Sequence, residues 1–384
     1  MKTTRRQFLA ASAALPFALR SFAQAAPVAP RWVLLGTDKG KGIYRAPWNP
    51  TTGELGKIDL AIESDRPDYF ARHGNLLYAA NAGSGANAAV SCFAISPATA
   101  DLKLLSHVSS HGDGPCYVAV DRTGRNVFVA NYNGGTATAY KASPEGALTE
   151  AYSLDCHTNP VCGPVGPTKP RQDAPHLHCT TIAPDNRFVL VCDLGSDAID
   201  IFPFTAGSMH PLDAPIRIAT RPGSGPRHVA FHPNAKWLYC IHELDCTIDL
   251  YDWTPTNGKP TLKLRQDSVI STLPKGVDLK GNTACEVVVS DDGRFLYACT
   301  RGTNDITVYR IDAATGLLTE QQRLSCGGKT PRIIAFDPSR KWLLSCNQGG
   351  AGSVTVFAHD PATGHVAETP KTFPADTPMF VQWV

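Results

Sequence analysis

The feature that most constrains the fold of this chain is an internal repeat that runs through most of it. One unit recurs: an apolar strand, an Asp-Pro or similar turn, a second strand, an Asn- or Asp-containing turn, a third strand, and a Thr-Gly-type turn before a fourth. Clear copies begin at Cys116, Thr180, Arg227, Cys285 and Arg332, and a weaker copy begins near Asp68. Their spacing of roughly 47 to 62 residues is typical of four strands per propeller blade.

The two ends of the chain complete the repeat. Residues 32–62 begin at a second strand and lack a first, whereas residues 377–384 are a first strand with nothing after it. Joined in one sheet, they make a further blade and protect edges that would otherwise be exposed. We therefore predict an all-β protein in which residues 26–384 form a single seven-bladed β-propeller domain. Each blade should have four strands, and the C-terminal strand should close the ring by joining the N-terminal blade.

Residues 1–25 have the anatomy of an export leader. They combine a charged start, a short apolar stretch and Ala23-Gln24-Ala25 as a small-x-small cleavage signal. Arg5-Arg6-Gln7-Phe8-Leu9 matches the twin-arginine signal peptide, and the alternative is an ordinary secretory leader. The apolar part is too short and too interrupted by proline for a membrane anchor. We expect a periplasmic or secreted protein with no membrane segment after leader removal.

The chain has 12 cysteines, which must be accommodated in an oxidising compartment. Most lie inside strand-like runs where related segments carry alanine, so we expect small buried apolar side chains. Two pairs are candidate disulfides: Cys156 with Cys162, and Cys240 with Cys246. No cysteine or histidine cluster has zinc-site spacing. We predict neither a metal nor a cofactor.

The overall charge gives no reason to expect a macromolecular partner. The formal net charge is +2, and no basic run is interleaved with aromatic residues, which argues against binding to nucleic acid. We expect a monomer that binds a small molecule, so the function must be inferred from local features.

Charged residues at strand ends give the local signal. In a four-stranded meander the innermost strand starts where the second strand finishes, so residues at both places line one mouth of the central channel. Arg227 and Arg332 start innermost strands, while Glu243, Arg301 and Gln348 end second strands. Clustered arginines favour a carboxylate or phosphate ligand. The alternative is a solvated rim that simply accumulates charge.

A long Pro-rich segment, residues 156–178, should lie on the same mouth. Long segments of this kind inside a compact domain tend to be binding loops or lids. Arg171 and Gln172 precede His176 and His178, which adds four polar candidates to the mouth. His157 and Lys169 are as compatible with a rigid surface loop.

Strand alternation ranks two further histidines lower. His228 follows Arg227 by one residue, so its side chain should point away from Arg227 and pack. His242 precedes Glu243 by one residue and is a second-rank candidate for the same reason.

The motifs around these residues resemble those of a known family. Arg171-Gln172 with Pro175-His176-Leu177-His178, the stretch from Gly225 to Asp245, and the stretches around Glu286 and Arg332 look like the propeller-type lactonases. That family includes 6-phosphogluconolactonases of propeller fold and the carboxy-cis,cis-muconate cyclases. The resemblance spans residues 31–384. It places the family's His-x-His on His176 and His178 and its Gly-Pro-Arg-His motif on residues 225–228. Its glutamates fall on Glu243 and Glu286.

The resemblance implies a lactone hydrolase, similar to 6-phosphogluconolactonase, that acts on an anionic lactone. Water would be activated by His178, His176 or Glu243, and Arg227 and Arg301 would stabilise the developing oxyanion. The expected catalytic residues are His178, Glu243, Arg227 and Arg301. The expected substrate-binding residues are His176, Arg332, Glu286, Arg171 and Gln348. Two alternatives stay open: a cycloisomerase that closes a muconate-type dicarboxylate to a lactone, and a non-catalytic propeller that binds a ligand or protein.

Overall fold

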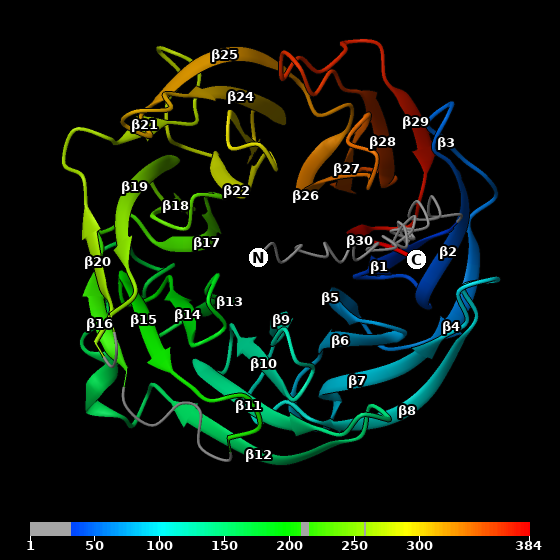
Figure 1. Ribbon diagram of the computed structural model, residues 1–384, viewed down its shortest axis with the longest axis horizontal. Helices are drawn as coiled ribbons and strands as arrows, with labels where there is room; N and C mark the ends of the chain where they lie inside the picture. Colours follow the sequence, from blue (N-terminus) through cyan, green and yellow to red (C-terminus); the bar gives the residue numbers. More distant parts are fainter. Residues whose placement is uncertain (1–31, 209–214, 257–258) are drawn as a thin grey trace, which may run out of the picture.

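The computed structural model describes residues 32–208, 215–256 and 259–384 of the chain. In these residues the strands form seven antiparallel sheets arranged in a ring (Figure 1). The predicted all-β, seven-bladed propeller is confirmed. The predicted leader, residues 1–25, lies outside the described residues. Within the described ranges no helix is long and apolar enough to cross a membrane.

The blades follow one another along the chain. Blade one contains β30 (Pro378–Trp383), β1 (Trp32–Thr37), β2 (Gly42–Asn49), β3 (Glu54–Leu55) and β4 (Asp59–Glu63). Blade two contains β5 (Pro67–His73), β6 (Leu76–Ala82), β7 (Ala88–Ile95) and β8 (Leu102–Ser109). Blade three contains β9 (Pro115–Val120), β10 (Asn126–Asn131), β11 (Thr136–Ala142) and β12 (Leu148–Asp155). Blade four contains β13 (Leu177–Ile182), β14 (Phe188–Asp193), β15 (Ala198–Pro203) and β16 (Ile216–Ala219).

The remaining three blades have the same order from the axis outward. Blade five contains β17 (Pro226–Phe231), β18 (Trp237–His242), β19 (Thr247–Thr254), β20 (Thr261–Leu264) and β21 (Ile270–Ser271). Blade six contains β22 (Thr283–Val289), β23 (Phe295–Arg301), β24 (Asp305–Ile311) and β25 (Leu318–Ser325). Blade seven contains β26 (Lys329–Phe336), β27 (Trp342–Gly349), β28 (Ser353–Ala358) and β29 (Lys371–Pro374). Two short 3-10 helices, η1 (Gly85–Asn87) and η2 (Pro160–Cys162), lie in loops.

Blade one closes the ring with strands from both ends of the described chain, as predicted. β30 pairs with β1 in antiparallel register, with Leu34 opposite Gln382. The indole of Trp383 donates a hydrogen bond of 2.9 Å to the carbonyl of Phe336 in blade seven, which fastens the closing strand to its neighbour. Closure therefore removes the unpaired strand edges that an open repeat would expose.

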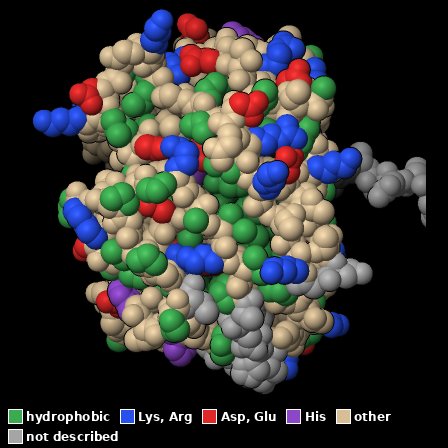
Figure 2. Space-filling view, turned by 90° about the vertical axis from the view of Figure 1, so that its left-hand side faces the viewer, with side chains coloured by type: hydrophobic (Ala, Val, Ile, Leu, Met, Phe, Trp, Pro, Cys, Tyr) green, Lys and Arg blue, Asp and Glu red, His purple; other side chains and the backbone are tan. Residues whose placement is uncertain are grey.

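The core lies between the blades rather than inside any one of them. All six residues of each of β10, β14 and β18 are buried, because a neighbouring blade packs on each face of these second strands. The outermost strand β8, by contrast, has exposed residues along its length. On the outer face seen in Figure 2, Lys and Arg side chains are interspersed with Asp and Glu.

Every blade has a β-bulge near the start of its innermost strand. The pairing register skips one residue there, so that Pro226 lies opposite His242 but His228 lies opposite Ile241, and Arg227 has no partner. The same shift occurs in each of the other six sheets. The seven skipped residues, which we call the bulge ring, are Asp68, Cys116, His178, Arg227, Cys285, Arg332 and Met379. Bulges of this kind re-aim side chains.

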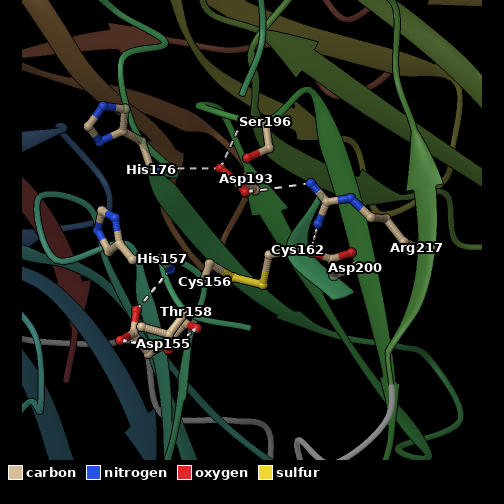
Figure 3. The surroundings of a disulfide bond; sticks show 10 residues. All are labelled: Asp155, Cys156, His157, Thr158, Cys162, His176, Asp193, Ser196, Asp200 and Arg217. Carbon is tan, nitrogen blue, oxygen red and sulfur yellow. Dashed lines mark hydrogen bonds and ion pairs between the residues drawn. A yellow bond between two sulfur atoms is a disulfide. The ribbon is translucent and has the colours of Figure 1, made fainter. Parts of the chain in front are cut away.

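The cysteines of the described residues form one bridge, and the free ones are buried as expected except for the partly buried Cys116. Cys156 and Cys162 form a disulfide, with their Cα atoms 5.2 Å apart, whereas Cys240 and Cys246 are free and buried. Of the two candidate pairs, only the first is therefore bonded in the described residues. The disulfide closes a short turn at the beginning of the loop before blade four (Figure 3).

Candidate active site

Glu243 lies at the centre of an arginine cluster. Its side chain is 2 % exposed and follows directly after β18. Oε2 lies 3.0 Å from Nε of Arg227 and 2.8 Å from Nη2 of Arg301, while Oε1 lies 2.6 Å from Nη2 of Arg171. One carboxylate thus holds three guanidinium groups that come from β17, β23 and the loop before blade four.

Local backbone geometry brings Arg227 and Glu243 together. The backbone N–H of Glu243 donates to the carbonyl of Gly225 at 2.8 Å, next to the start of β17. Gly225 has a φ of +63°, and a Cβ at this position would lie 2.6 Å from the side chain of Leu244. Only glycine fits this close turn without strain. The Gly-Pro-Arg sequence is therefore what places Arg227 against Glu243.

Glu243 stays ionised in this environment. Burial alone would raise its pKa, but the surrounding guanidinium groups, led by Arg301 and Arg227, hold the pKa well below its usual range. A carboxylate held so firmly as an anion is a weak proton acceptor. Its chemical role here is to balance and orient the arginines.

His178 is the bulge-ring residue of blade four, and it is buried beside this cluster. Its Nε2 lies 3.8 Å from Oε2 of Glu243, and its Nδ1 is buried with no hydrogen-bond partner in the described residues. Burial, followed by the charge of Arg227, holds the pKa of His178 well below its ordinary value. The imidazole is therefore neutral at neutral pH.

His228 does not point away from Arg227 as strand alternation predicted. Nη1 of Arg227 lies 3.1 Å from Nε2 of His228, and Nδ1 of His228 donates to Oε1 of Glu286 at 3.0 Å. The prediction was wrong because it assumed regular alternation from Arg227 to His228. The bulge at Arg227 interrupts that alternation. Arg227, His228 and Glu286 thus form one buried polar chain below the mouth.

The arginine cluster opens into a cavity of about 200 Å³. It is lined by Arg66, Asp68, Ala82, Gly114, Cys116, Tyr132, Asn133, Arg171, His178, Glu243, Arg301 and Arg332. A smaller hollow of about 10 Å³ is lined by Asp68, Tyr69, Cys116, Arg227, His228, Arg332 and Met379. Asp68, Cys116 and Arg332 line both, and arginines outnumber carboxylates in the larger cavity.

Arg332 differs from the arginines around Glu243. Its guanidinium group has no hydrogen bond and no ion pair with any described residue, although it lines both hollows. Burial, followed by the charge of Arg227, lowers its pKa from the ordinary value, yet a guanidinium remains charged in proteins. It is a cation in the cavity wall with no hydrogen-bonded or ion-paired partner among the described residues, although the carboxyl group of Asp68 acts on its charge.

Arg227 lines only the smaller hollow, and three further expected site residues line neither hollow. The ring of His176 stacks on Tyr132, with Nδ1 donating to the carbonyl of Tyr132 at 2.9 Å and Nε2 lying 3.1 Å from Asp173. Nε2 of Gln348 donates to Oδ2 of Asp38 at 2.9 Å. Glu286 lies in the buried polar chain below the mouth. Their predicted roles in substrate binding stay predictions, and the geometry gives them support roles around the cavity.

The loop before blade four reaches the site through Arg171. Its guanidinium also donates to the hydroxyl of Tyr132 at 2.8 Å. The neighbouring Gln172 is fully buried and donates to the carbonyl of Leu194 at 2.9 Å, which fixes the loop to blade four. Figure 3 shows the disulfide of the same loop close to Asp193, whose Oδ1 accepts the backbone N–H of His176 at 2.9 Å.

The sequence interpretation missed Asp68 and Arg66 as cavity residues. Asp68 occupies the same position in the repeat as Arg227, and only the weakness of the second-blade copy hid it. Arg66 precedes that strand and pairs with Asp38, Nε to Oδ1 at 2.9 Å. Among the described residues no group of three or more His, Cys, Asp and Glu side chains is placed to hold a metal ion.

The fold and the site together define a seven-bladed propeller with a cationic cavity lined by residues of several blades. Its family follows from comparison with known proteins. The chain belongs to the lactonase family, because the family model described as "Lactonase, 7-bladed beta-propeller" matches residues 33–383. The expected resemblance to the propeller-type lactonases is confirmed.

Individual relatives agree with this assignment. The chain is 29 % identical to the 6-phosphogluconolactonase of Bacillus subtilis over 347 residues, which cover 90 % of this chain and 95 % of the relative. A crystal structure of a putative 6-phosphogluconolactonase from Bacteroides fragilis superposes with a TM-score of 0.82 at 28 % identity, covering 93 % of this chain and 98 % of the other. The periplasmic gluconolactonase of Pseudomonas aeruginosa gives a TM-score of 0.82 at 25 % identity, with 92 % and 98 % covered.

Proposed function

We propose that this protein hydrolyses a small anionic sugar lactone in the cavity at the mouth of the propeller. The observation that carries the proposal is the guanidinium of Arg332, which lines the cavity without a hydrogen bond or ion pair to a described residue. The other arginines of the cavity are paired, Arg171 and Arg301 with Glu243 and Arg66 with Asp38. An uncompensated cation in such a place is suited to bind the acidic group of a ligand. Family membership supplies the reaction class, lactone hydrolysis.

The size of the cavity favours a small substrate. Its volume of about 200 Å³ lies below the range of roughly 300–1,000 Å³ that accommodates drug-sized ligands. A monosaccharide lactone is of suitable size. The names of the relatives, 6-phosphogluconolactonase and gluconolactonase, point to the same class.

The side chains around the cavity support distinct roles. Arg332 would bind the acidic group of the substrate. Arg301 lines the cavity and has a buried Nε with no partner in the described residues, so it can donate to the oxyanion that forms at the lactone carbonyl. His178, neutral and with a free Nδ1, would hold the attacking water.

The predicted leader places this reaction outside the cytoplasm, in the periplasm or the medium. A phosphorylated sugar lactone is an intermediate of cytoplasmic metabolism, so a lactone whose anionic group is a carboxylate suits this location better. Fractionation of cells that carry the Arg5→Lys, Arg6→Lys double variant tests the location. Retention of that variant in the cytoplasm is expected, and unchanged export would exclude the twin-arginine route.

The activity is tested on the purified mature protein, residues 26–384, with a panel of lactones followed by proton release. Gluconolactone, 6-phosphogluconolactone and glucarolactone separate neutral, phosphorylated and carboxylated substrates. We expect hydrolysis of at least one anionic lactone, and a loss of about 100-fold or more in kcat for Arg301→Met. Arg122→Met, on the exposed surface, is the matched control.

Absence of hydrolysis across the panel would exclude the proposal. The same preparation can then be assayed for loss of muconate absorbance, which would identify a cycloisomerase. Tight lactone binding without turnover would identify a binding protein instead.

A further inference from the structure

The cavity contains two carboxylates in opposite environments. Glu243 is held by three guanidinium groups, as described above. Asp68, which lines the same cavity, has no hydrogen bond and no ion pair with any described residue. Pairs of titratable groups whose surroundings drive their pKa values apart commonly divide the acid–base work of an active site.

Asp68 is held in place by the fold rather than by polar partners. It is the bulge-ring residue of β5, its side chain is only 8 % exposed, and its Oδ1 is fully buried without a partner. It also lines the smaller hollow that Arg227 and His228 enter from blade five. A buried carboxylate without hydrogen bonds is costly, so its presence requires an explanation.

The groups that face Asp68 come from several blades. The charged groups that act on it are Arg332, Asp38, Arg66 and Asp65. The other residues that share the smaller hollow with it are Tyr69, Cys116, Arg227, His228, Arg332 and Met379. Burial is the largest influence and raises the pKa of Asp68 to about 7, against the opposing charge of Arg332. At neutral pH the carboxyl group can therefore both accept and release a proton.

We propose that Asp68 is the general base and acid of the lactone hydrolysis proposed above, on which this inference rests. Asp68 takes a proton from water as the water oxygen bonds to the lactone carbonyl carbon, and the carbonyl electron pair moves to its oxygen beside Arg301. When this intermediate collapses, the bond between the carbonyl carbon and the ring oxygen breaks, and Asp68 returns its proton to that oxygen. The products are one hydroxy acid and the original carboxylate of Asp68.

Other groups at the site are less suited to this step. Glu243 is fixed as an anion by its arginines, and the pKa of His178 is too low for an efficient base at neutral pH. Both ring nitrogens of His176 already have partners, the carbonyl of Tyr132 and the carboxylate of Asp173. Asp68 and His178 both line the cavity with an atom that has no hydrogen-bond partner, and of the two only Asp68 has a pKa near neutral pH.

The test compares Asp68→Asn with the wild-type mature protein on the lactone that the wild type hydrolyses fastest in the panel. Asp68→Ser is a second variant of smaller side chain, and Asp376→Asn, on the exposed surface, is the control. We expect both Asp68 variants to lose about 100-fold or more in kcat. The wild-type rate should rise with pH through about 7 as Asp68 loses its proton, and this rise should be absent from the variants. Because Asn removes an unpaired buried charge, the melting temperature of Asp68→Asn should not fall.

The outcomes separate the two proposals. A wild type that hydrolyses lactones together with Asp68 variants that keep its rate and pH profile would overturn the role of Asp68 and leave the hydrolysis standing. A loss of activity that is matched by a lower melting temperature in both variants would assign Asp68 a structural role and overturn the proposal. A wild type that hydrolyses no lactone would overturn both.

Discussion

Nε of Arg227 lies 3.0 Å from Oε2 of Glu243, and both side chains are 2 % exposed. A pair so deeply buried is costly to assemble and more costly to break, because removal of one member leaves the other charge without compensation. Glu243 also forms ion pairs with Arg171 and Arg301. The pair therefore links the stability of the propeller to the arrangement of its candidate active site.

Removal of the charge of Glu243 should destabilise the protein strongly. In Glu243→Gln three guanidinium groups lose their shared counter-ion, and we expect a decrease of about 3–5 kcal/mol in the free energy of unfolding. Denaturant titration followed by tryptophan fluorescence measures it. Glu54→Gln, which breaks an exposed ion pair with Lys371, is the control and should change little. Equal stability of the two variants would contradict the counter-ion role.

Arg332→Met should affect binding more than folding. The variant removes a buried cation that has no hydrogen bond and no ion pair in the described residues, so we expect the melting temperature to stay the same or rise. With an anionic lactone, the loss of a charge-assisted hydrogen bond of about 1.5–3 kcal/mol should raise KM by roughly tenfold to a hundredfold. KM for a neutral lactone should change much less. Equal losses on charged and neutral lactones would argue against an anion-binding role.

The raised pKa of Asp68 gives a stability effect with a defined sign. The carboxyl is protonated in the folded protein at pH values where the unfolded chain has released the proton, so stability should fall as pH rises from about 4 to about 7. A shift from 3.8 to about 7 corresponds to at most about 4 kcal/mol. Asp68→Asn should lack this loss, and its advantage over the wild type should therefore be larger at pH 8 than at pH 4. Thermal unfolding across this pH range measures the difference, and a constant offset would contradict the assignment.

The disulfide between Cys156 and Cys162 should stabilise the loop that carries Arg171. Closing so short a loop is worth about 2 kcal/mol at most in the chain-entropy description. We expect the Cys156→Ser, Cys162→Ser variant to keep the propeller fold, to be cleaved faster by protease between residues 157 and 175, and to turn over more slowly. Cys240→Ser, Cys246→Ser changes two free cysteines and serves as the comparison. Identical protease patterns in wild type and the loop variant would show that Gln172 and its partners suffice to hold the loop.

The architecture could be predicted from the sequence because the same four-stranded unit recurs along the chain. Each copy supplies the same turns and strands, so a weak copy such as that at Asp68 is supported by its neighbours. The convergence of Arg227, Glu243 and Arg301 followed from strand direction alone. The ring of blades and the meeting of these three side chains both depend on the order and direction of the strands, and the repeat determines that order and direction.

The finer geometry of the site could not be obtained in this way. The orientation of His228 depends on a bulge, and a bulge changes the alternation of a strand without a distinct residue signal. His176 and Gln348 are near the mouth but turn to Tyr132 and Asp38, partners that come from other blades. The hydrogen-bond partners of these side chains are determined by packing between segments that lie far apart in the sequence.

The bulge ring has a consequence for how this scaffold can change. Each of its seven residues is skipped by the pairing between strands, so a substitution there does not shift the register of a sheet. Asp, Cys, His, Arg and Met already occupy equivalent places in this one chain. New specificity can therefore arise most readily at Asp68 and Arg332, which line the cavity without a fixed partner, whereas a change at Arg227 also breaks its buried pair with Glu243.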